Sequence, residues 1–237
     1  MRAAIVLIIL FLGLFSCNLL RKGFEVNQGG VVNSVYQDTL PLEYVKDKII
    51  LPVWVNGKKR RFIFDTGAIT VISESLFREM DYPVMGKDHF FDIHKNRDTS
   101  LLVRTGAMQL GNITFSRIPA IVYDLESLPW RCFQVDGIIG SNMLRNAAVQ
   151  VDLRDSLFIL AHDARKLSNN IHRAGRMRLD RQSSPFVPVK FDAVHEGFFL
   201  FDSGDDGFVN MQKSRFDILE GKIPVNFKRQ GYGSNKM

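Results

Sequence analysis

The chain has 237 residues, of which 46% are hydrophobic and 24% are charged, and its formal net charge is +6. This length allows one large domain or two small lobes, and the composition excludes a chain that is disordered throughout. The basic residues are scattered, and the densest run, Lys58 to Arg61, is predicted to be the solvated tip of a hairpin. We therefore do not expect the clustered basic face of a nucleic-acid-binding protein.

The N-terminus carries the pattern of a secretory signal. Arg2 is followed by an apolar run over residues 3–15, which is short for a membrane-spanning helix. The run ends in Leu14-Phe15-Ser16-Cys17, which resembles the lipobox of bacterial lipoproteins. The resemblance implies a signal peptide over residues 1–17, lipid attachment at Cys17, and a location in the bacterial cell envelope, on the periplasmic or outer-surface side. The alternative is an ordinary cleaved signal, or an apolar helix with an incidental cysteine.

The segment after the signal is polar. Residues 18–39 contain Gly29-Gly30 and several Asn and Gln residues, and this composition predicts a flexible tether between the lipid and a folded domain that begins at Leu40.

From Leu40 onward, short apolar runs alternate with turn residues. The runs over residues 49–55 and 61–64 flank Asn56-Gly57, the strongest short-range signal for a type I′ hairpin. The pattern predicts a mainly β fold. Further strands are expected over residues 101–104, 107–110, 120–123, 149–153 and 157–160, and short helices over residues 73–80 and 142–146.

An internal repeat organises the chain. Phe62-Ile63-Phe64-Asp65-Thr66-Gly67 and Phe199-Leu200-Phe201-Asp202-Ser203-Gly204 share the order apolar strand, aspartate, hydroxyl residue and glycine. A proline also lies in the strand before each copy, Pro52 at 13 residues and Pro188 at 14 residues ahead of the aspartate. The repeat predicts two related lobes, a first over residues 40–163 and a partial second over residues 185–237, joined by a polar connection over residues 164–184.

Each copy of the repeat would place one carboxylate on a rigid turn. The buried strand fixes the aspartate, the hydroxyl group can form hydrogen bonds within the site, and the glycine allows close approach of the backbone. Two such turns packed face to face would bring Asp65 and Asp202 to within a few ångströms. Like charges at this separation do not both ionise easily, so the pair would hold one proton. One carboxylate could then act as a general base on water while the other donates a proton to a substrate carbonyl.

The residues Phe64-Asp65-Thr66-Gly67-Ala68 resemble the signature of the pepsin-like and retropepsin-like aspartic peptidases. Ile138-Ile139-Gly140 resembles a second element of this family, which packs beneath the catalytic loop. The resemblance implies a two-lobed acid-protease-like β-barrel, a water activated between two aspartates, an extended peptide substrate beneath a hairpin flap, and no metal or organic cofactor. It implies these site residues: Asp65 and Asp202 as catalytic groups, with Thr66, Gly67, Ser203, Gly204, Ile138, Ile139 and Gly140 as their support.

The second copy departs from the family pattern in two ways. Gly204 is followed by Asp205-Asp206 where the family has a small residue, and the sequence ends at Met237, too soon for a second apolar-apolar-glycine element. We therefore expect the second lobe to be incomplete. This departure leaves three alternatives open: a homodimer in which two copies of Asp65 form the pair, a catalytically inactive peptide-binding envelope protein with a peptidase-like fold, and a fragment of a longer reading frame.

Two other groups of residues are candidate sites. Asp88, His89, Asp92 and His94 could bind a metal, but their polar surroundings favour a solvated turn, and no metal site is expected. Cys132 has no partner for a disulfide once Cys17 is set aside, and with Trp130 and Phe133 nearby it is predicted to be a small buried apolar residue.

Overall fold

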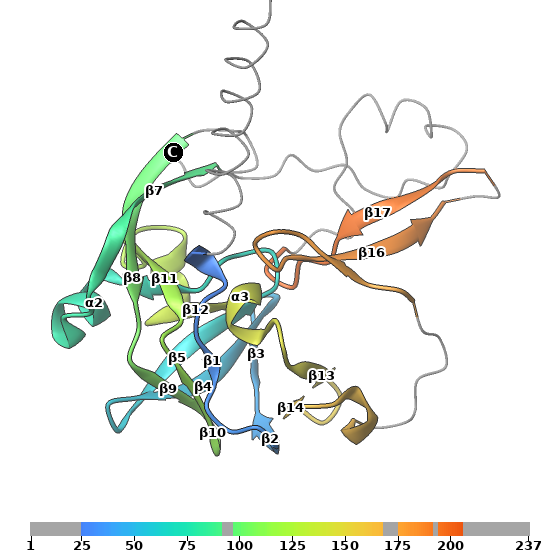
Figure 1. Ribbon diagram of the computed structural model, residues 1–237, viewed down its shortest axis with the longest axis horizontal. Coiled ribbons are helices and arrows are strands. Elements are labelled where there is room, and N and C mark those ends of the chain that lie inside the picture. Colours follow the sequence, from blue (N-terminus) through green and yellow to red (C-terminus); the bar gives the residue numbers. More distant parts are fainter. Residues whose placement is uncertain (1–24, 92–96, 168–174, 192–193, 206–237) are drawn as a thin grey trace, which may run out of the picture.

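The computed structural model of the protein describes residues 25–91, 97–167, 175–191 and 194–205, with the backbone alone for residues 88–91, 97 and 98. The fold is mainly β, as the alternating apolar runs predicted, and it consists of one large curled sheet and two three-stranded sheets (Figure 1). Cys17, Asp92, His94 and Asp206 lie outside the described residues.

The large sheet has eleven strands in the order β1-β10-β9-β4-β5-β12-β6-β11-β8-β7, and β3 pairs with β4 off this path. Their bounds are β1 Gly30–Val31, β3 Glu43–Val45, β4 Lys48–Val55, β5 Lys58–Asp65, β6 Val71–Ser73, β7 Val84–Phe91, β8 Arg97–Arg104, β9 Ala107–Leu110, β10 Ile113–Ser116, β11 Pro119–Tyr123 and β12 Gly137–Gly140.

The two smaller sheets have the orders β13-β14-β2 and β15-β16-β17. Figure 1 shows the β16–β17 hairpin projecting from the side of the curled sheet. The strand bounds are β2 Gln37–Pro41, β13 Ala148–Asp152, β14 Leu157–Ala161, β15 Arg178–Leu179, β16 Pro185–Lys190 and β17 Glu196–Leu200. The described helices are α2 Glu74–Met80 and α3 Ser141–Leu144, with the 3-10 helices η1 Trp130–Phe133 and η2 Ala164–Lys166.

The β4–β5 hairpin forms as its sequence predicted. Asn56 and Gly57 both have positive φ, at 49° and 74°, as a type I′ turn requires. Apolar side chains of both strands enter the core of the curled sheet, where Phe62 is fully buried and the Phe64 ring meets the Phe158 ring edge-on at 5.1 Å. Burial of a side chain of this size contributes roughly 1.5–3 kcal/mol, so this core fixes the strand that ends at Asp65.

Strand β12 lies parallel to β5, with Gly140 opposite Asp65, and antiparallel to β6. The glycines at its two ends are required by crowding. A Cβ on Gly137 would lie 2.2 Å from the Phe62 ring, and a Cβ on Gly140 would lie 2.3 Å from the carbonyl carbon of Ile69. The glycine-apolar-apolar-glycine sequence therefore lets this strand pass directly beneath the loop after β5.

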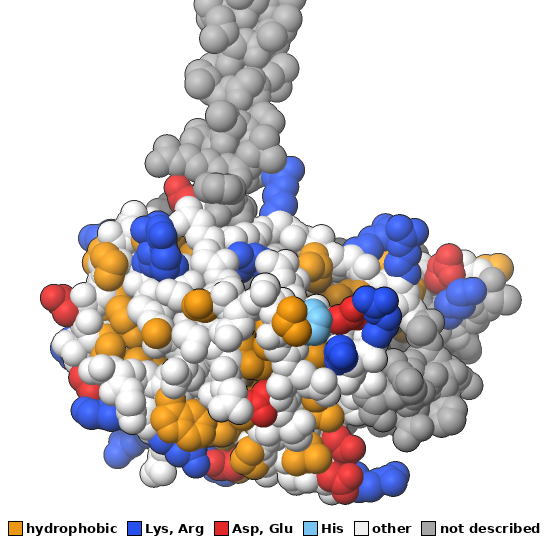
Figure 2. Space-filling model, turned by 60° about the horizontal axis from the view of Figure 1, so that its bottom comes forward, with side chains coloured by type: hydrophobic (Ala, Val, Ile, Leu, Met, Phe, Trp, Pro, Cys, Tyr) orange, Lys and Arg blue, Asp and Glu red, His pale blue; other side chains and the backbone are white. Residues whose placement is uncertain are grey.

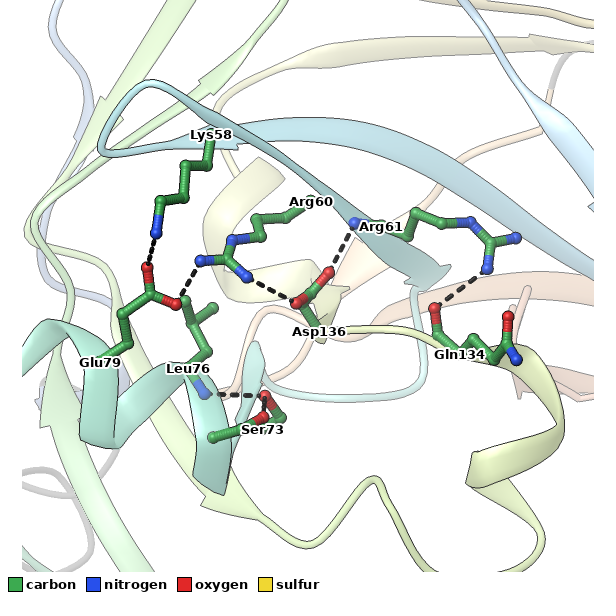
Figure 3. Close-up of polar contacts among 9 residues, drawn as sticks. Lys58, Arg60, Arg61, Ser73, Leu76, Glu79, Gln134 and Asp136 are labelled. Carbon is green, nitrogen blue, oxygen red and sulfur yellow. Dashed lines mark hydrogen bonds and ion pairs between the residues drawn. The ribbon is translucent and has the colours of Figure 1, made fainter.

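Polar contacts join β5 to α2 and to the start of β12 (Figure 3). Glu79 accepts hydrogen bonds from Lys58, at 2.7 Å, and from the Arg60 guanidinium. Asp136 accepts from the Arg61 backbone N–H at 2.9 Å and pairs with Arg60 at 3.3 Å. The prediction of a solvated basic tip is wrong for Arg60, whose side chain is 18% exposed, because the two carboxylates on neighbouring elements pair with it.

Residues 25–39 are part of the fold, which corrects the expectation of a tether over residues 18–39. Val26 is 3% exposed and packs in the core, and β1 and β2 pair with β10 and β14. The Val26 carbonyl accepts a hydrogen bond from Asn142 Nδ2 at 3.0 Å. Burial and hydrogen bonding thus outweigh the chain entropy that the polar composition was taken to favour.

The residues that follow the first lobe also form hydrogen bonds with the N-terminal part of the described chain. In the predicted connection over residues 164–184, the Ser183 hydroxyl donates to Asn27 Oδ1 at 2.7 Å, and Asn27 Nδ2 donates to the Arg181 carbonyl at 2.8 Å. Ser183 and Ser184 are buried. The segment from Arg181 to Ser184 is therefore held against the N-terminal residues of the described chain.

The molecular surface corrects the expectation for Cys132. On the face shown in Figure 2, Lys and Arg side chains are interspersed with acidic ones instead of forming a stripe. Cys132 is exposed, because it lies on the 3-10 helix η1, which buries none of its residues, so its prediction as a buried apolar residue is wrong. None of the helices in the described part of the chain is long and apolar enough to cross a membrane.

Candidate active site

Two loops with the same local geometry carry the two aspartates. Asp65 is the last residue of β5, and Asp202 follows two residues after the end of β17. The Gly67 N–H donates to Asp65 Oδ1 at 2.8 Å, and the Gly204 N–H donates to Asp202 Oδ1 at 2.9 Å. Each carboxylate is thus oriented by the backbone two residues further on, in the same way in both copies of the repeat.

The hydroxyl residues of the two loops bind each other reciprocally. Thr66 Oγ1 accepts from the Ser203 N–H at 3.0 Å, and Ser203 Oγ accepts from the Thr66 N–H at 3.0 Å. Each hydroxyl also donates across the pair, Thr66 to the carbonyl of Phe201 and Ser203 to the carbonyl of Phe64. These four hydrogen bonds form two matching pairs, and they hold the two loops together.

Each carboxylate rests on the glycine of the opposite loop. A Cβ on Gly67 would lie 2.3 Å from Asp202 Oδ2, and a Cβ on Gly204 would lie 2.2 Å from Asp65 Cγ. Real Cβ atoms do not approach heavy atoms so closely, so a side chain at either position would force the opposite carboxylate or its loop to move. The absence of a side chain at the two glycines is what brings Asp65 and Asp202 together.

The pairing changes the acidity of Asp65. Burial of its carboxyl, followed by the charge and the hydrogen bond of Asp202, raises the pKa of Asp65 from 3.8 to about 7. The Gly67 N–H and the positive charge of Lys48 act in the opposite direction. A carboxyl with such a pKa keeps its proton in mildly acidic solution, so the pair can present a proton donor and a proton acceptor together.

The predicted supporting residues lie directly beneath the first loop. Ile138 and Ile139 are buried, and Gly140 is opposite Asp65. The backbone N–H of the next residue, Ser141, donates to the Ala68 carbonyl at 3.0 Å. The apolar-apolar-glycine element therefore supports the loop that carries Asp65 from below.

Two supporting residues were missed from the sequence. The buried side chain of Asn142 accepts from Thr70 N and Thr70 Oγ1, both at 2.8 Å, and donates to the carbonyls of Val26 and Pro119. An asparagine two residues after an apolar-apolar-glycine strand was a signal for such a role. Lys48 was missed as well, and its Nζ donates to the Gly204 carbonyl at 2.5 Å.

Most of the other candidate residues from the sequence have no described side chain. Cys17 lies outside the described residues, as do Asp92 and His94, and only the backbone is described for Asp88 and His89. Within the described ranges there is no group of three or more His, Cys, Asp or Glu side chains that could hold a metal ion.

A family model and solved structures match parts of the chain. Residues 51–143 match the model of a family described as aspartyl protease. Among solved structures, the chain is similar to a retropepsin-like aspartic protease from Rickettsia conorii, with 17% sequence identity and a TM-score of 0.38, over 54% of this chain and 92% of that one. No curated protein matches the chain significantly. The segment that the family model matches contains Asp65, Thr66, Gly67 and the β12 element, and it ends before Asp202.

Proposed function

We propose that the protein is an aspartic-type endopeptidase in which Asp65 and Asp202 activate one water molecule between them. The observation that carries the proposal is the mutual packing of the two loops, in which each carboxylate lies on the other loop's glycine. The raised pKa of Asp65 supports it, because a pair that shares one proton contains both an acid and a base.

The chemistry of this arrangement is general acid–base catalysis. The ionised carboxylate takes a proton from water as the water oxygen attacks the peptide carbonyl carbon, and the protonated carboxyl donates its proton to the carbonyl oxygen. When the tetrahedral intermediate collapses, the C–N bond breaks, the amide nitrogen takes a proton from the pair, and one hydroxyl of the intermediate gives its proton back to the pair as the carboxylic acid forms. The pair thus returns to one proton, and one water is consumed for each bond that is cut.

The substrate of this proposal is an extended peptide, bound by strand-like pairing in the cleft between the lobes. The proposal also places the protein in the bacterial cell envelope, held by a lipid on Cys17. Both parts rest on the sequence patterns described above, and the location is tested by metabolic labelling with a radioactive fatty acid, which should label the native chain and not a Cys17→Ala variant.

The activity is tested with the chain lacking residues 1–17 and a denatured protein mixture as substrate, from acidic to neutral pH. We expect cleavage products that disappear in Asp65→Asn and in Asp202→Asn. Asp155→Asn is the matched control, since Asp155 lies on an exposed turn. Cleavage that persists in either dyad variant, or a folded protein that binds peptides and cleaves none at any pH, would contradict the proposal.

A further inference from the structure

Lys48 lies directly across the sheet from Asp65. It is the first residue of β4 and follows a tight turn in which Lys46 and Asp47 both have positive φ. Because Ile50 is opposite Ile63 in the β4–β5 pair, the same register continued by two residues places Lys48 opposite Asp65. Residues that are directly opposite in an antiparallel pair have their side chains on the same face, so the lysine side chain starts beside the aspartate.

The ammonium group of Lys48 connects the two loops of the site. The half-buried Lys48 side chain reaches out of the first lobe, and its Nζ donates to the Gly204 carbonyl at 2.5 Å. Gly204 is the residue on which the Asp65 carboxyl rests. A hydrogen bond from a charged donor is stronger than one between neutral groups, so this contact is suited to holding the second loop in place.

In the described residues of the second copy, the position that corresponds to Lys48 holds no cation. Phe186 is opposite Leu200 in the β16–β17 pair, and the Phe201 N–H donates to the Pro185 carbonyl at 2.8 Å. The same register places Ser184 opposite Asp202, and Ser184 is a buried neutral residue. Among the described residues, the two copies therefore match in their aspartates, hydroxyl residues and glycines, but differ at the position of Lys48.

We propose that Lys48 is a positioning residue of the two-aspartate site, which holds the Gly204 loop and, through its positive charge next to Asp65, shifts the working pH range of the pair downward. The proposal rests on the peptidase function proposed above. The charged groups near Asp65 have opposite effects on it: the charge of Asp202 opposes ionisation of Asp65, and the charge of Lys48 favours it. Asp205 adds a further acidic residue to the second loop, and its N–H donates to Asp202 Oδ1 at 3.1 Å. Lys46 and Asp47, on the turn before β4, are exposed.

The charge and the hydrogen bond can be separated by substitution. Lys48→Met removes both and keeps the length of the side chain, whereas Lys48→Arg keeps a cation that can donate to the same carbonyl. Lys46→Met is the matched control, because it removes a lysine charge from the exposed turn two residues away. Lys48→Gln serves in place of Lys48→Met if the methionine variant does not fold.

The test is a pH titration of the Asp65 carboxyl by ¹³C NMR, with the signal assigned from its loss in Asp65→Asn. We expect Lys48→Met to raise the pKa of Asp65 by about 0.5–1 unit, as the loss of a nearby cation would, and Lys48→Arg to leave it near the wild-type value. The alkaline limb of the pH profile for peptide cleavage should move upward by the same amount in Lys48→Met and not in Lys46→Met.

An unchanged titration in Lys48→Met, or equal shifts in Lys48→Met and Lys48→Arg, would overturn the role of the Lys48 charge. The titration does not depend on turnover, so the two proposals can fail separately. A shifted titration in a protein that cleaves no peptide contradicts the peptidase function alone, and normal cleavage with an unshifted titration contradicts the role of Lys48 alone.

Discussion

At the scale of single residues, the site depends on two glycines, Gly67 and Gly204, as much as on the two aspartates. The carboxyl of Asp65 occupies the space that a side chain at Gly204 would need, and Asp202 does the same at Gly67. Neither glycine has a positive φ, so their role is to allow close approach and not to adopt an unusual backbone conformation. The separation of the two carboxylates is therefore sensitive to the smallest added group.

A Gly204→Ala substitution tests this sensitivity. The new Cβ would lie 2.2 Å from Asp65 Cγ, so the loops must move apart and the shared proton is lost. We expect peptide cleavage to fall at least 100-fold, on the order of the effect of misplacing reacting groups by 1 Å. Gly86→Ala is the control, since a Cβ there meets nothing within 4 Å. Equal activity of Gly204→Ala and Gly86→Ala would show that the loops do not pack as described.

The raised pKa of Asp65 also predicts how stability depends on pH. A carboxyl whose pKa rises from 3.8 to about 7 on folding binds more protons in the native state between these values, so the wild-type free energy of unfolding falls as pH rises from about 4 to about 7. Asp65→Asn removes the titrating group, so the free energy of unfolding of this variant should not show this fall with pH. Urea unfolding should show the variant more stable than wild type at pH 8 by on the order of 2 kcal/mol, and not at pH 4. A difference that is the same at both pH values would contradict the raised pKa.

At the scale of elements, the site is built by segments that are distant in the sequence. Strand β12 supports the Asp65 loop from below, and Asn142, which follows it, binds both Thr70 and the Val26 carbonyl. The N-terminal residues in turn bind the segment from Arg181 to Ser184, and Ser184 lies opposite Asp202 in the register of the second hairpin. The N-terminal segment is therefore a structural link between the parts that carry the two aspartates.

This link predicts that the side chain of Val26 contributes to the stability of the fold, although Val26 lies in a polar stretch of sequence. Val26→Asp puts a charge into the core and should lower the free energy of unfolding by about 2–4 kcal/mol, with cleavage reduced in proportion to the unfolded fraction. Val32→Asp is the matched control, because Val32 is 66% exposed. Thermal unfolding of the two variants gives the comparison, and equal melting temperatures would contradict the packing of this segment.

Some of these elements could be predicted because their causes are local. Asn56-Gly57 specifies its turn through backbone preferences, and Ser73 begins α2 as its N-cap by accepting from the Leu76 N–H. The repeat predicted that two equivalent loops would exist. Other features depend on tertiary contacts between distant segments, which composition and periodicity do not predict. These features are the burial of Val26, the exposure of Cys132 and the hydrogen bond from Lys48 to Gly204.

At the scale of the whole molecule, the described structure places both aspartate loops on one chain. Two reciprocal hydrogen bonds between Thr66 and Ser203, and two more from their hydroxyl groups to the carbonyls of Phe201 and Phe64, join the two copies of the repeat within the monomer. This arrangement is the internal equivalent of a symmetric dimer, in which the same contacts would be made by two copies of one loop. A pair made of two Asp65 residues, the homodimer considered from the sequence, would have to displace the second loop from these contacts.

The most direct test of the account is cleavage of a denatured protein by wild type, by Asp65→Asn, by Asp202→Asn, and by an equimolar mixture of the two variants. If one chain supplies both carboxylates, the wild-type protein alone cleaves, and the mixture remains as inactive as each variant. Activity of Asp202→Asn by itself would show that Asp65 works without its partner loop, as in the homodimer. Recovery of activity in the mixture would show that the pair forms between two chains, and either result would contradict the account.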